Sequence, residues 1–572
     1  MRANWTTTSP IGALTLGVAL TLTACGGGKT VHPWQYNPRS LADTLAIVEP
    51  EEQKIPLFYE VVSNSLFGGG GSSGGDAWNA DPFDGVVNST WFTHRNSVSP
   101  LSPDDVRRGP QRLEGPDTSG PLTVTSIKAE GVTPGFNAKD AAGARWIIKF
   151  DPPDMPELAS GAEVVATNLA WAAGYNTPEN YVFLLNPDNL ALDDDLEMVL
   201  TDELAYPVVY SVAGDGDQRL TKAHFLEQVL GRYPRRSDGT IRALASRFLD
   251  GVPLGPFSYS GVRFDDPNDV IPHEHRRELR GLYSVAAWLN HTDTKSGNSL
   301  DMFIPAARQP TGGTRIGYVK HHLIDFGSTL GSAAFDRHIV RDGDEHMLDL
   351  NMMKRRLFSL GLYRAYWQKN PTPETPPALG YYSLDNYNPG DWRPNLPNPA
   401  FSSATPADAY WGAKIVMSFT NEQLAGAVDA AQYSDPANAR QLLEVLRQRR
   451  DATGRYWFAQ VTPIENVAIV DGALTFDDNW IEHFGGTGEY RYEFDWDAPD
   501  PDLEDKGSVT RQRIPLPVPS GDVERRGQPE DDLAVLRVWS RSPLGGWASN
   551  PATLWLAWNQ GLREWLIIGI RH

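Results

Sequence analysis

The pattern of apolar and polar positions divides most of the chain into three stretches of different texture. Between 122 and 185, apolar and polar residues alternate in short runs, which predicts strands around a single helix over 161–173. Between about 270 and 450, apolar residues recur at helical spacing, and from 461 to 572 the alternation typical of strands returns. We therefore expect an α+β protein with an antiparallel β domain at its C-terminal end.

Shorter patterns give these elements their bounds. Asp471-Gly472 interrupts the β pattern and predicts a hairpin, because this pair favours a tight two-residue turn. Thr420 and Gln423 fit a capping box, which predicts a helix start between them. The expected helices cover 221–231, 352–363, 411–419, 421–432 and 436–450, and the expected strands cover 468–476, 490–496, 533–539, 554–558 and 565–570.

The composition is that of a globular protein with more than one core. The chain has 572 residues, of which 40% are hydrophobic and 22% are charged, and this length exceeds what a single core holds. The formal net charge is −21, with no basic block to offset it. This balance argues against nucleic acid, and against an anionic membrane surface, as a partner.

The N-terminus predicts export. Arg2 precedes an apolar run over 11–22, and Cys25 follows in Leu22-Thr-Ala-Cys25 as the only cysteine of the chain. A positive start, a short apolar run and small residues before a cleavage point are typical of a signal peptide. The run is shorter than the roughly 20 residues that a membrane-spanning helix needs.

This segment resembles the lipobox of bacterial lipoproteins. The resemblance implies cleavage before Cys25, acylation of its sulfur, and an exported protein anchored to the cell envelope through the lipid bilayer. A plain secretory peptide and a buried N-terminal helix are the alternatives. Residues 25–80 are expected to form a flexible tether, because the segment 68–75 consists entirely of Gly and Ser. A phosphate-binding loop is the alternative for 68–75, but no Lys followed by Ser or Thr accompanies these glycines.

The densest candidate chemistry lies between 283 and 327. An apolar helix leads into a polar loop with His291 and Asp293, and Asn298 follows five residues after Asp293. An apolar run then ends in Asp325-Phe-Gly327. A phosphoryl-transfer site needs one carboxylate to accept the proton of the attacking hydroxyl, and an amide and a second carboxylate to hold a metal ion. The order and spacing of these residues meet that need, although each alone also fits an ordinary turn.

Two charged residues upstream fit the same chemistry. Lys149 lies in the apolar strand 145–150, where an ammonium that points inward can pair with phosphate oxygens. Glu163 lies in the following helix, where it can pair with Lys149 or, alternatively, form a capping box with Ser160. Gly131 and Gly135 lie in the bend before this strand, and glycines there let backbone amides approach phosphate.

Together these motifs resemble the protein-kinase-like superfamily, with His291-Thr-Asp293 in place of His-Arg-Asp. Atypical bacterial kinases of the HipA type and secreted kinases of the Golgi type are the nearest in style. The resemblance implies a two-lobed domain, with a β-rich N-lobe and a helical C-lobe, that binds ATP and Mg²⁺. It implies the following roles: Asp293 as catalytic base, Lys149 and Glu163 as the phosphate-orienting pair, Gly131, Gly135, Lys149 and Lys295 in nucleotide binding, and Asn298 and Asp325 as metal ligands.

The expected organisation has five parts: a signal peptide over 1–24, the tether over 25–80, a leader and N-lobe with an insert over 81–240, a C-lobe over 241–460, and a β-rich domain over 461–572. No Ala-Pro-Glu follows Asp325-Phe-Gly327, so a protein-kinase activation segment is not predicted. The acceptor, or a protein partner in the envelope, is left open.

Three other readings of the sequence remain. The fold could be retained as a catalytically inactive kinase-like scaffold or binding lipoprotein. The function could instead lie in the β domain, whose aromatic residues could stack on sugars, although core packing is their commoner use. A zinc site is the third, since the chain holds His273, His275, His291, His321 and His322, but the HExxH pattern is absent.

Overall fold

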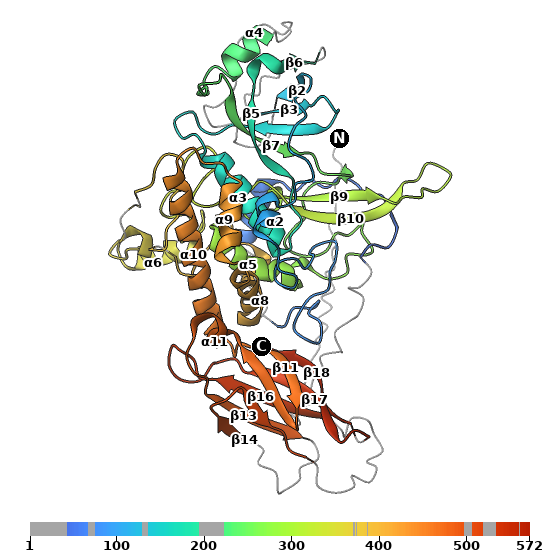
Figure 1. The fold of residues 1–572 in the computed structure, drawn as a ribbon, viewed down its shortest axis with the longest axis vertical. Helices are drawn as coiled ribbons and strands as arrows, with labels where there is room; N and C mark the ends of the chain where they lie inside the picture. Colours follow the sequence, from blue (N-terminus) through green and yellow to red (C-terminus); the bar gives the residue numbers. More distant parts are fainter. Residues whose placement is uncertain are drawn as a thin grey trace, which may run out of the picture. The chain divides into compact units, whose positions relative to one another are not determined.

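The structure is a computed structural model that describes residues 43–66, 75–127, 135–193, 222–369, 372, 374–385, 387–496, 506–518, 533–559 and 561–572. Within these residues it contains eleven α-helices and four β-sheets, so the fold is α+β, as the sequence predicts (Figure 1). Cys25, Gly131 and most of the glycine-rich segment 68–75 lie outside the described residues. No helix among the described residues is long and apolar enough to cross a bilayer.

A six-stranded sheet carries Lys149. Its order is β5-β7-β4-β3-β2-β6, and its neighbours pair antiparallel except β2 and β6, which are parallel. Trp146 and Ile148 of β4 are completely buried in the core beneath the sheet, so the alternation of β4 fixes which residues face that core. The strands are β2 (Leu122–Ile127), β3 (Gly135–Lys139), β4 (Arg145–Lys149), β5 (Asn180–Leu185), β6 (Leu190–Leu192) and β7 (Ile241–Arg247).

Helix α3 (Leu158–Ala173) follows β4 and starts three residues before the expected position. Ser160 lies inside the helix, where its amide and hydroxyl donate to Asp151 at 2.7 Å each. The capping-box interpretation of Ser160 and Glu163 is therefore wrong. The carboxylate of Glu163 can instead pair with a group outside the helix. Nearly every residue of α3 is buried, so this helix is a core element.

Four helices that follow build the largest apolar core: α5 (Arg277–Leu289), α8 (Pro406–Met417), α9 (Asn421–Asp429) and α10 (Pro436–Phe458). Helices α5 and α8 approach closely because glycines meet at their contact. A Cβ added to Gly412 would lie 2.2 Å from the carbonyl oxygen of Gly281, and a Cβ on Gly281 would lie 2.4 Å from the ring of Trp411. Either contact is far inside van der Waals distance, so larger residues would force these helices apart.

Some helices begin or end at other residues than expected, because tertiary contacts determine their bounds. The capping box of Thr420 and Gln423 is confirmed at the start of α9. Helix α10 continues eight residues past the expected end at 450, because Gly454 packs against Met417 instead of breaking the helix. The other expected helices correspond to α4 (Lys222–His224) with a π-turn over Phe225–Val229, α6 (Leu350–Phe358) and α8.

The C-terminal region forms two antiparallel sheets, as predicted. One has the order β11-β12-β15 and the other β14-β13-β16-β17-β18, and both contribute to one apolar core. Asp471 and Gly472 have φ angles of 48° and 67°, which is the left-handed turn that their sequence predicts. The strands are β11 (Ile464–Val470), β12 (Ala473–Asp478), β13 (Tyr490–Trp496), β14 (Lys506–Val509), β15 (Arg513–Pro515), β16 (Leu533–Ser540), β17 (Ala552–Asn559) and β18 (Glu564–Arg571), with α11 (Asn479–Phe484) after β12.

Part of the segment expected to be a tether is folded. Residues 43–66 contain β1 (Ile47–Val48) and α1 (Leu57–Leu66). Strand β1 joins β8 (Val252–Pro253), β9 (Ser299–Pro305) and β10 (Ile316–Leu323) in a sheet of order β1-β10-β9-β8. The tether expectation is wrong for these residues because Ile47 packs in a small core with Phe303 and Val319, and Glu60 accepts from Ser296.

A buried ion network ties the leader to the C-terminal end of the chain. Asp84 lies 2.8 Å from Arg277 of α5 and 2.8 Å from His572. Arg571 donates to the carbonyl oxygen of Asp81 at 2.6 Å, and the amide of Ile570 donates to that of Pro82 at 2.8 Å. These contacts make the last residues of the chain part of the same structure as the leader. The leader also includes the short helix α2 (Pro103–Arg108).

Candidate active site

Lys149 brings together the sheet, helix α3 and the Asp-Phe-Gly segment. Its Nζ lies 2.8 Å from Oε1 of Glu163 and 3.0 Å from Oδ1 of Asp325. Burial lowers the pKa of Lys149, but the charges of Asp325 and Glu163 outweigh it and hold the pKa above its ordinary value. The lysine is therefore a fixed cation, and its pairing with Glu163 and Asp325 orients both carboxylates.

Asp325 has a backbone conformation that few residues adopt. Its φ is +59°, in the left-handed region that costs a non-glycine residue of the order of 1 kcal/mol or more. The preceding amide of Ile324 donates to the carbonyl oxygen of Asn298 at 3.0 Å, which ties this turn to the polar loop. A Cβ added to Gly327 would lie 3.3 Å from Oε2 of Glu163. The surroundings thus fix the turn, with Asp325 about 40% exposed at its side chain.

Asp293 is oriented by two neighbours from its own loop. Lys295 Nζ lies 2.8 Å from Oδ2 of Asp293, and Asn298 Nδ2 donates to the same oxygen at 3.0 Å. Asn298 Nδ2 also donates to the carbonyl oxygen of Asp293 at 2.8 Å. No described residue bonds to Oδ1 of Asp293, so this oxygen can accept a proton from a hydroxyl. The structure places the predicted residues of this loop in contact with one another.

Donor chemistry at Asn298 and Asp325 fits Mg²⁺. Because Nδ2 of Asn298 faces Asp293, its amide oxygen faces away from that carboxylate. An amide oxygen and a carboxylate are the hard ligands that Mg²⁺ prefers, and it often takes only one or two protein ligands beside phosphates and water. Among the described residues, here included, no group of three or more His, Cys, Asp or Glu side chains is placed to hold a metal ion.

Gly135 has a structural reason to be glycine. It pairs with Lys149 across β3 and β4, and a Cβ there would lie 2.1 Å from the carbonyl oxygen of Ile148. Close strand packing therefore accounts for Gly135 without a nucleotide. Gly131, its predicted companion, lies outside the described residues.

Two of the predicted histidines, His273 and His321, serve packing. His321 Nδ1 lies 2.6 Å from Asp301, and His273 Nε2 lies 2.7 Å from Asp269. The His321 ring stacks on Trp91 at 3.5 Å, and His273 meets Trp91 edge-on at 4.6 Å. Each of these two imidazoles thus has its own carboxylate and a common aromatic neighbour, which is the arrangement of a polar core cluster.

His291 and His338 contact the segments on either side of the polar loop. The ring of His291 stacks on Phe326 with centroids 5.1 Å apart. His338 is buried, and its Nε2 lies 3.2 Å from Thr292 Oγ1 and 3.3 Å from Ser328 Oγ. His338 therefore joins the loop before Asp293 to the segment after Asp325, a role that its sequence position does not indicate.

Acidification is expected to destabilise the fold through His338. Burial lowers the pKa of His338 to about 4, from an ordinary value near 6.5. Below about pH 6.5 the imidazole of the unfolded chain takes up a proton, whereas that of the folded chain stays neutral until about pH 4. The free energy of unfolding therefore falls by about 3 kcal/mol as the pH is lowered across that window. His338→Asn should flatten this part of the pH dependence in urea-unfolding curves. An unchanged slope in the variant would assign the acid sensitivity to other groups.

Glu60 is a site residue that the sequence analysis missed. It is the buried residue of α1, and its Oε1 accepts from the amide of Ser296 at 2.8 Å and from its hydroxyl at 2.9 Å. Ser296 lies between Lys295 and Asn298, so the carboxylate of Glu60 holds the loop that carries them. No local pattern could reveal this contact, because 236 residues separate the partners.

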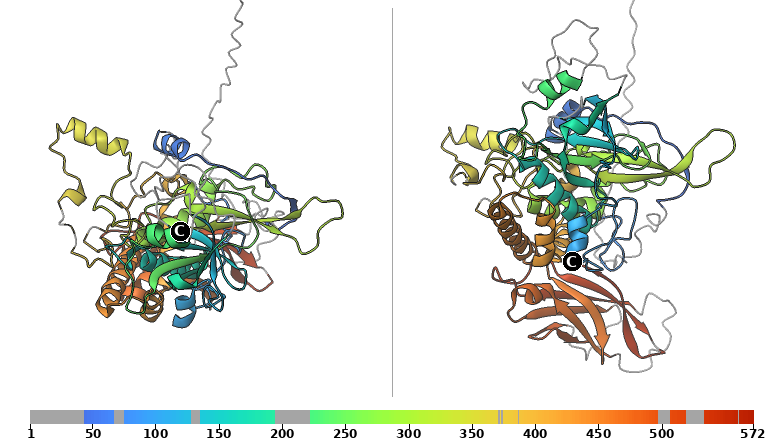
Figure 2. Two further views of the ribbon diagram at one scale, coloured as in Figure 1. Left: turned by 90° about the horizontal axis from the view of Figure 1, so that it is seen from above. Right: turned by 45° about the horizontal axis from the view of Figure 1, so that its top comes forward.

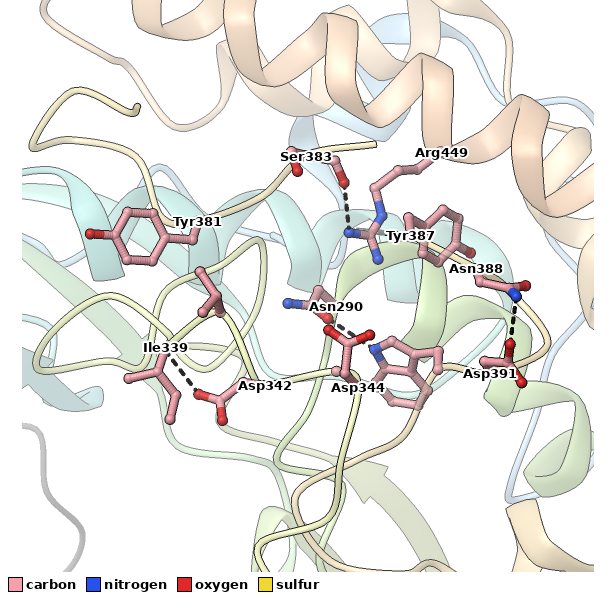
Figure 3. A pocket seen from close by; sticks show the side chains of 13 residues that line it. Asn290, Ile339, Asp342, Asp344, Tyr381, Ser383, Tyr387, Asn388, Asp391 and Arg449 are labelled. Atoms are coloured by element: carbon pink, nitrogen blue, oxygen red, sulfur yellow. Dashed lines mark hydrogen bonds between the residues drawn. The ribbon is translucent and has the colours of Figure 1, made fainter. Parts of the chain in front are cut away.

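A small cavity that is partly open to solvent adjoins the polar loop at Asn290 (Figure 3). Trp392 Nε1 donates to Oδ1 of Asn290 at 2.9 Å, and Arg449 closes the cavity from α10. Burial and the neighbouring Glu345 raise the pKa of Asp344, in the cavity wall, to about 7. The cavity contains none of the residues predicted to bind nucleotide or metal.

Comparison of the chain with protein-family models, with curated proteins and with solved structures gave no match.

Proposed function

We propose that the chain is a kinase-like phosphotransferase that uses ATP and Mg²⁺. In this proposal the six-stranded sheet with α3 is the N-lobe, and the helical core around α5 is the C-lobe. The observation that carries the proposal is the double contact of Lys149, whose Nζ binds Glu163 and, 176 residues away in the chain, Asp325. Phosphoryl transfer requires a fixed cation beside a metal-binding carboxylate, and this contact supplies both.

In this proposal each residue of the site has a separate role in phosphoryl transfer. Lys149 would bind phosphate oxygens of ATP, Asn298 and Asp325 would hold Mg²⁺, and the bound nucleotide would supply the phosphoryl group. Asp293 would accept the proton of the acceptor hydroxyl at Oδ1 while Asn298 and Lys295 hold Oδ2. The ammonium of Lys295, two residues after Asp293, would offset the negative charge of the transferring group. The acceptor would be a molecule with a free hydroxyl, since Asp293 would take up a hydroxyl proton.

The place of action follows from the N-terminal segment. We infer from the pattern around Cys25 that the protein is exported and carries lipid on this cysteine. Metabolic labelling with a radioactive fatty acid should mark the full chain and leave Cys25→Ser unlabelled. Label on the Cys25→Ser chain would contradict acylation at this residue.

Mg²⁺–ATP is expected to raise the thermal unfolding midpoint of the full chain. A ligand that binds only the folded state stabilises it by about 2.7 kcal/mol at a hundredfold excess over its dissociation constant. In Asp325→Ala the Mg²⁺-dependent part of the shift should vanish. Asp336→Ala, an exposed carboxylate in the same segment, is the matched control and should keep the shift. No shift of the parent chain with ATP or GTP would contradict the nucleotide site.

The alternative is an inactive scaffold of the same fold. It predicts nucleotide-dependent stabilisation without any transfer of phosphate from ATP. Measuring both on one preparation separates the two functions.

A further inference from the structure

The outer face of α6 and of the segment after it is the most exposed apolar surface of the described residues. Exposed fractions there reach 83% for Phe358, 90% for Leu360 and 87% for Leu362, and Leu357 is 70% exposed. None of the residues of α6 is buried. Surfaces of this kind mark interaction sites, because leaving several large apolar side chains in water has an energetic cost.

The same face is basic within a strongly acidic chain. Lys354, Arg355, Arg364 and Lys369 are all exposed, and no Asp or Glu occurs between 350 and 369, although the whole chain has a net charge of −21. The overall charge led us to expect no contact with an anionic surface. The local charge reverses that expectation for this segment, because screening in salt solution confines electrostatic attraction to about 8–10 Å.

The inner face of α6 is attached to the protein by specific bonds, so the outward face has a defined direction. Arg356 donates to Glu345 at 2.7 Å and 3.0 Å, and Trp367 Nε1 donates to the same carboxylate at 2.7 Å. Asp349 caps the start of the helix by accepting from the amide of Met352 at 2.9 Å. Met352, Arg356 and Ser359 are half-buried at helical spacing, which places Lys354, Leu357 and Phe358 on the opposite side, where all three are exposed.

We infer that this face docks on an anionic lipid surface. Its residues are Met353, Lys354, Arg355, Leu357, Phe358, Leu360, Leu362 and Arg364, and we call it the α6 face. Helices that lie in a membrane interface combine large apolar side chains with Lys and Arg, as this face does, and each cation near an anionic bilayer adds electrostatic attraction. The contact is additional to acylation at Cys25 and does not depend on it.

Helix α1 extends toward the same side. In the left view of Figure 2, α1 (blue) and α6 (yellow) project beyond the same edge of the protein. Helix α1 exposes Phe58 at 81% and Tyr59 at 68%, while its Glu60 holds Ser296 of the polar loop. Docking through the α6 face would therefore bring α1, and the loop that it supports, toward the headgroups.

An environment-sensitive fluorophore on Phe358→Cys tests the docking. In a full chain that also carries Cys25→Ser, the introduced cysteine is the only one, so labelling is specific and acylation is excluded. Vesicles of phosphatidylcholine mixed with phosphatidylglycerol should shift the emission to the blue, and vesicles of phosphatidylcholine alone should shift it far less. Lys354→Glu with Arg355→Glu should weaken vesicle binding, read at the same label, by at least about tenfold.

The matched control is a label on Leu544→Cys, which is 72% exposed in the β domain. A shift at position 358 that is absent at 544 and lost in the charge-reversed variant supports the proposal. No shift at 358, or equal shifts at both positions, overturns it. Neither outcome bears on acylation or on ATP binding, which have their own measurements.

Discussion

Asp293→Asn is expected to lower the rate of phosphoryl transfer from ATP by about 10²- to 10⁴-fold, the usual contribution of a general base. Asparagine keeps the shape of the side chain and an oxygen that can accept from Lys295 and Asn298, which lie 2.8 Å and 3.0 Å from Oδ2 of Asp293. It cannot take up the proton of an attacking hydroxyl. The loop of the variant should thus keep its structure but have no group that accepts the proton.

The measurement is the formation of ADP and of phosphorylated product at saturating Mg²⁺–ATP. Thermal stabilisation by Mg²⁺–ATP, measured on the same samples, should be unchanged in Asp293→Asn. Asp495→Asn, whose side chain is 67% exposed on β13, serves as the matched control and should have the parent rate. Turnover by Asp293→Asn at the parent rate would remove Asp293 from the role of base. A parent chain that binds ATP but never turns it over would favour the inactive scaffold.

Asp84→Ala is expected to lower the free energy of unfolding by about 3 kcal/mol or more, which is typical when one partner of a buried ion pair is removed. Asp84 is 2% exposed and lies 2.8 Å from both Arg277 and His572. Without it, Arg277 keeps only the carboxylate of Asp408, at 2.9 Å, and the cation at Arg571 loses its nearest charge. The attachment of the β domain's last strand to the leader should weaken most.

The same residue should give the parent chain part of its acid sensitivity. Burial raises the pKa of Asp84, but Arg277 and His572 outweigh it and hold the pKa well below its ordinary value. A carboxyl with a depressed pKa contributes its full stability above the unfolded pKa, near 3.9, and loses it as the pH falls further. Urea midpoints below about pH 4 should therefore decline less steeply in Asp84→Ala than in the parent chain. Asp104→Ala, an exposed carboxylate, should change neither the midpoint nor the slope, and an equal loss there would contradict the network's role.

Local patterns predicted the elements that depend on neighbours in the chain. Strict alternation predicted β13 with its observed bounds, and Asp471-Gly472 predicted the turn between β11 and β12. The order of Lys149, Glu163, Asp293 and Asp325 also implied one site, and the structure places Lys149 against Glu163 and Asp325. Lys149 ends β4, Glu163 lies within α3, and Asp293 and Asp325 follow α5 and β10, so local geometry largely sets the direction of each side chain.

Contacts between distant segments could not be predicted from such patterns. Glu60 lies in a stretch that composition assigned to a tether, and only its partner Ser296 reveals its place. His338 is one histidine in a polar segment, and its role follows from Thr292 and Ser328. Gly454 is a helix breaker by propensity, but its packing against Met417 keeps α10 intact. In each case a tertiary contact outweighs the local preference.

The bonds between the leader and the end of the chain also set the order of folding. The carbonyl oxygens of Ala80 and Asp81 accept from Arg571, about 490 residues later, and Asn96 donates to Ser418, 322 residues later. Loop closure over such distances is slow, and it cannot begin until the later segment has been synthesised. The early segments must therefore wait with their apolar surface uncovered, which favours capture by chaperones.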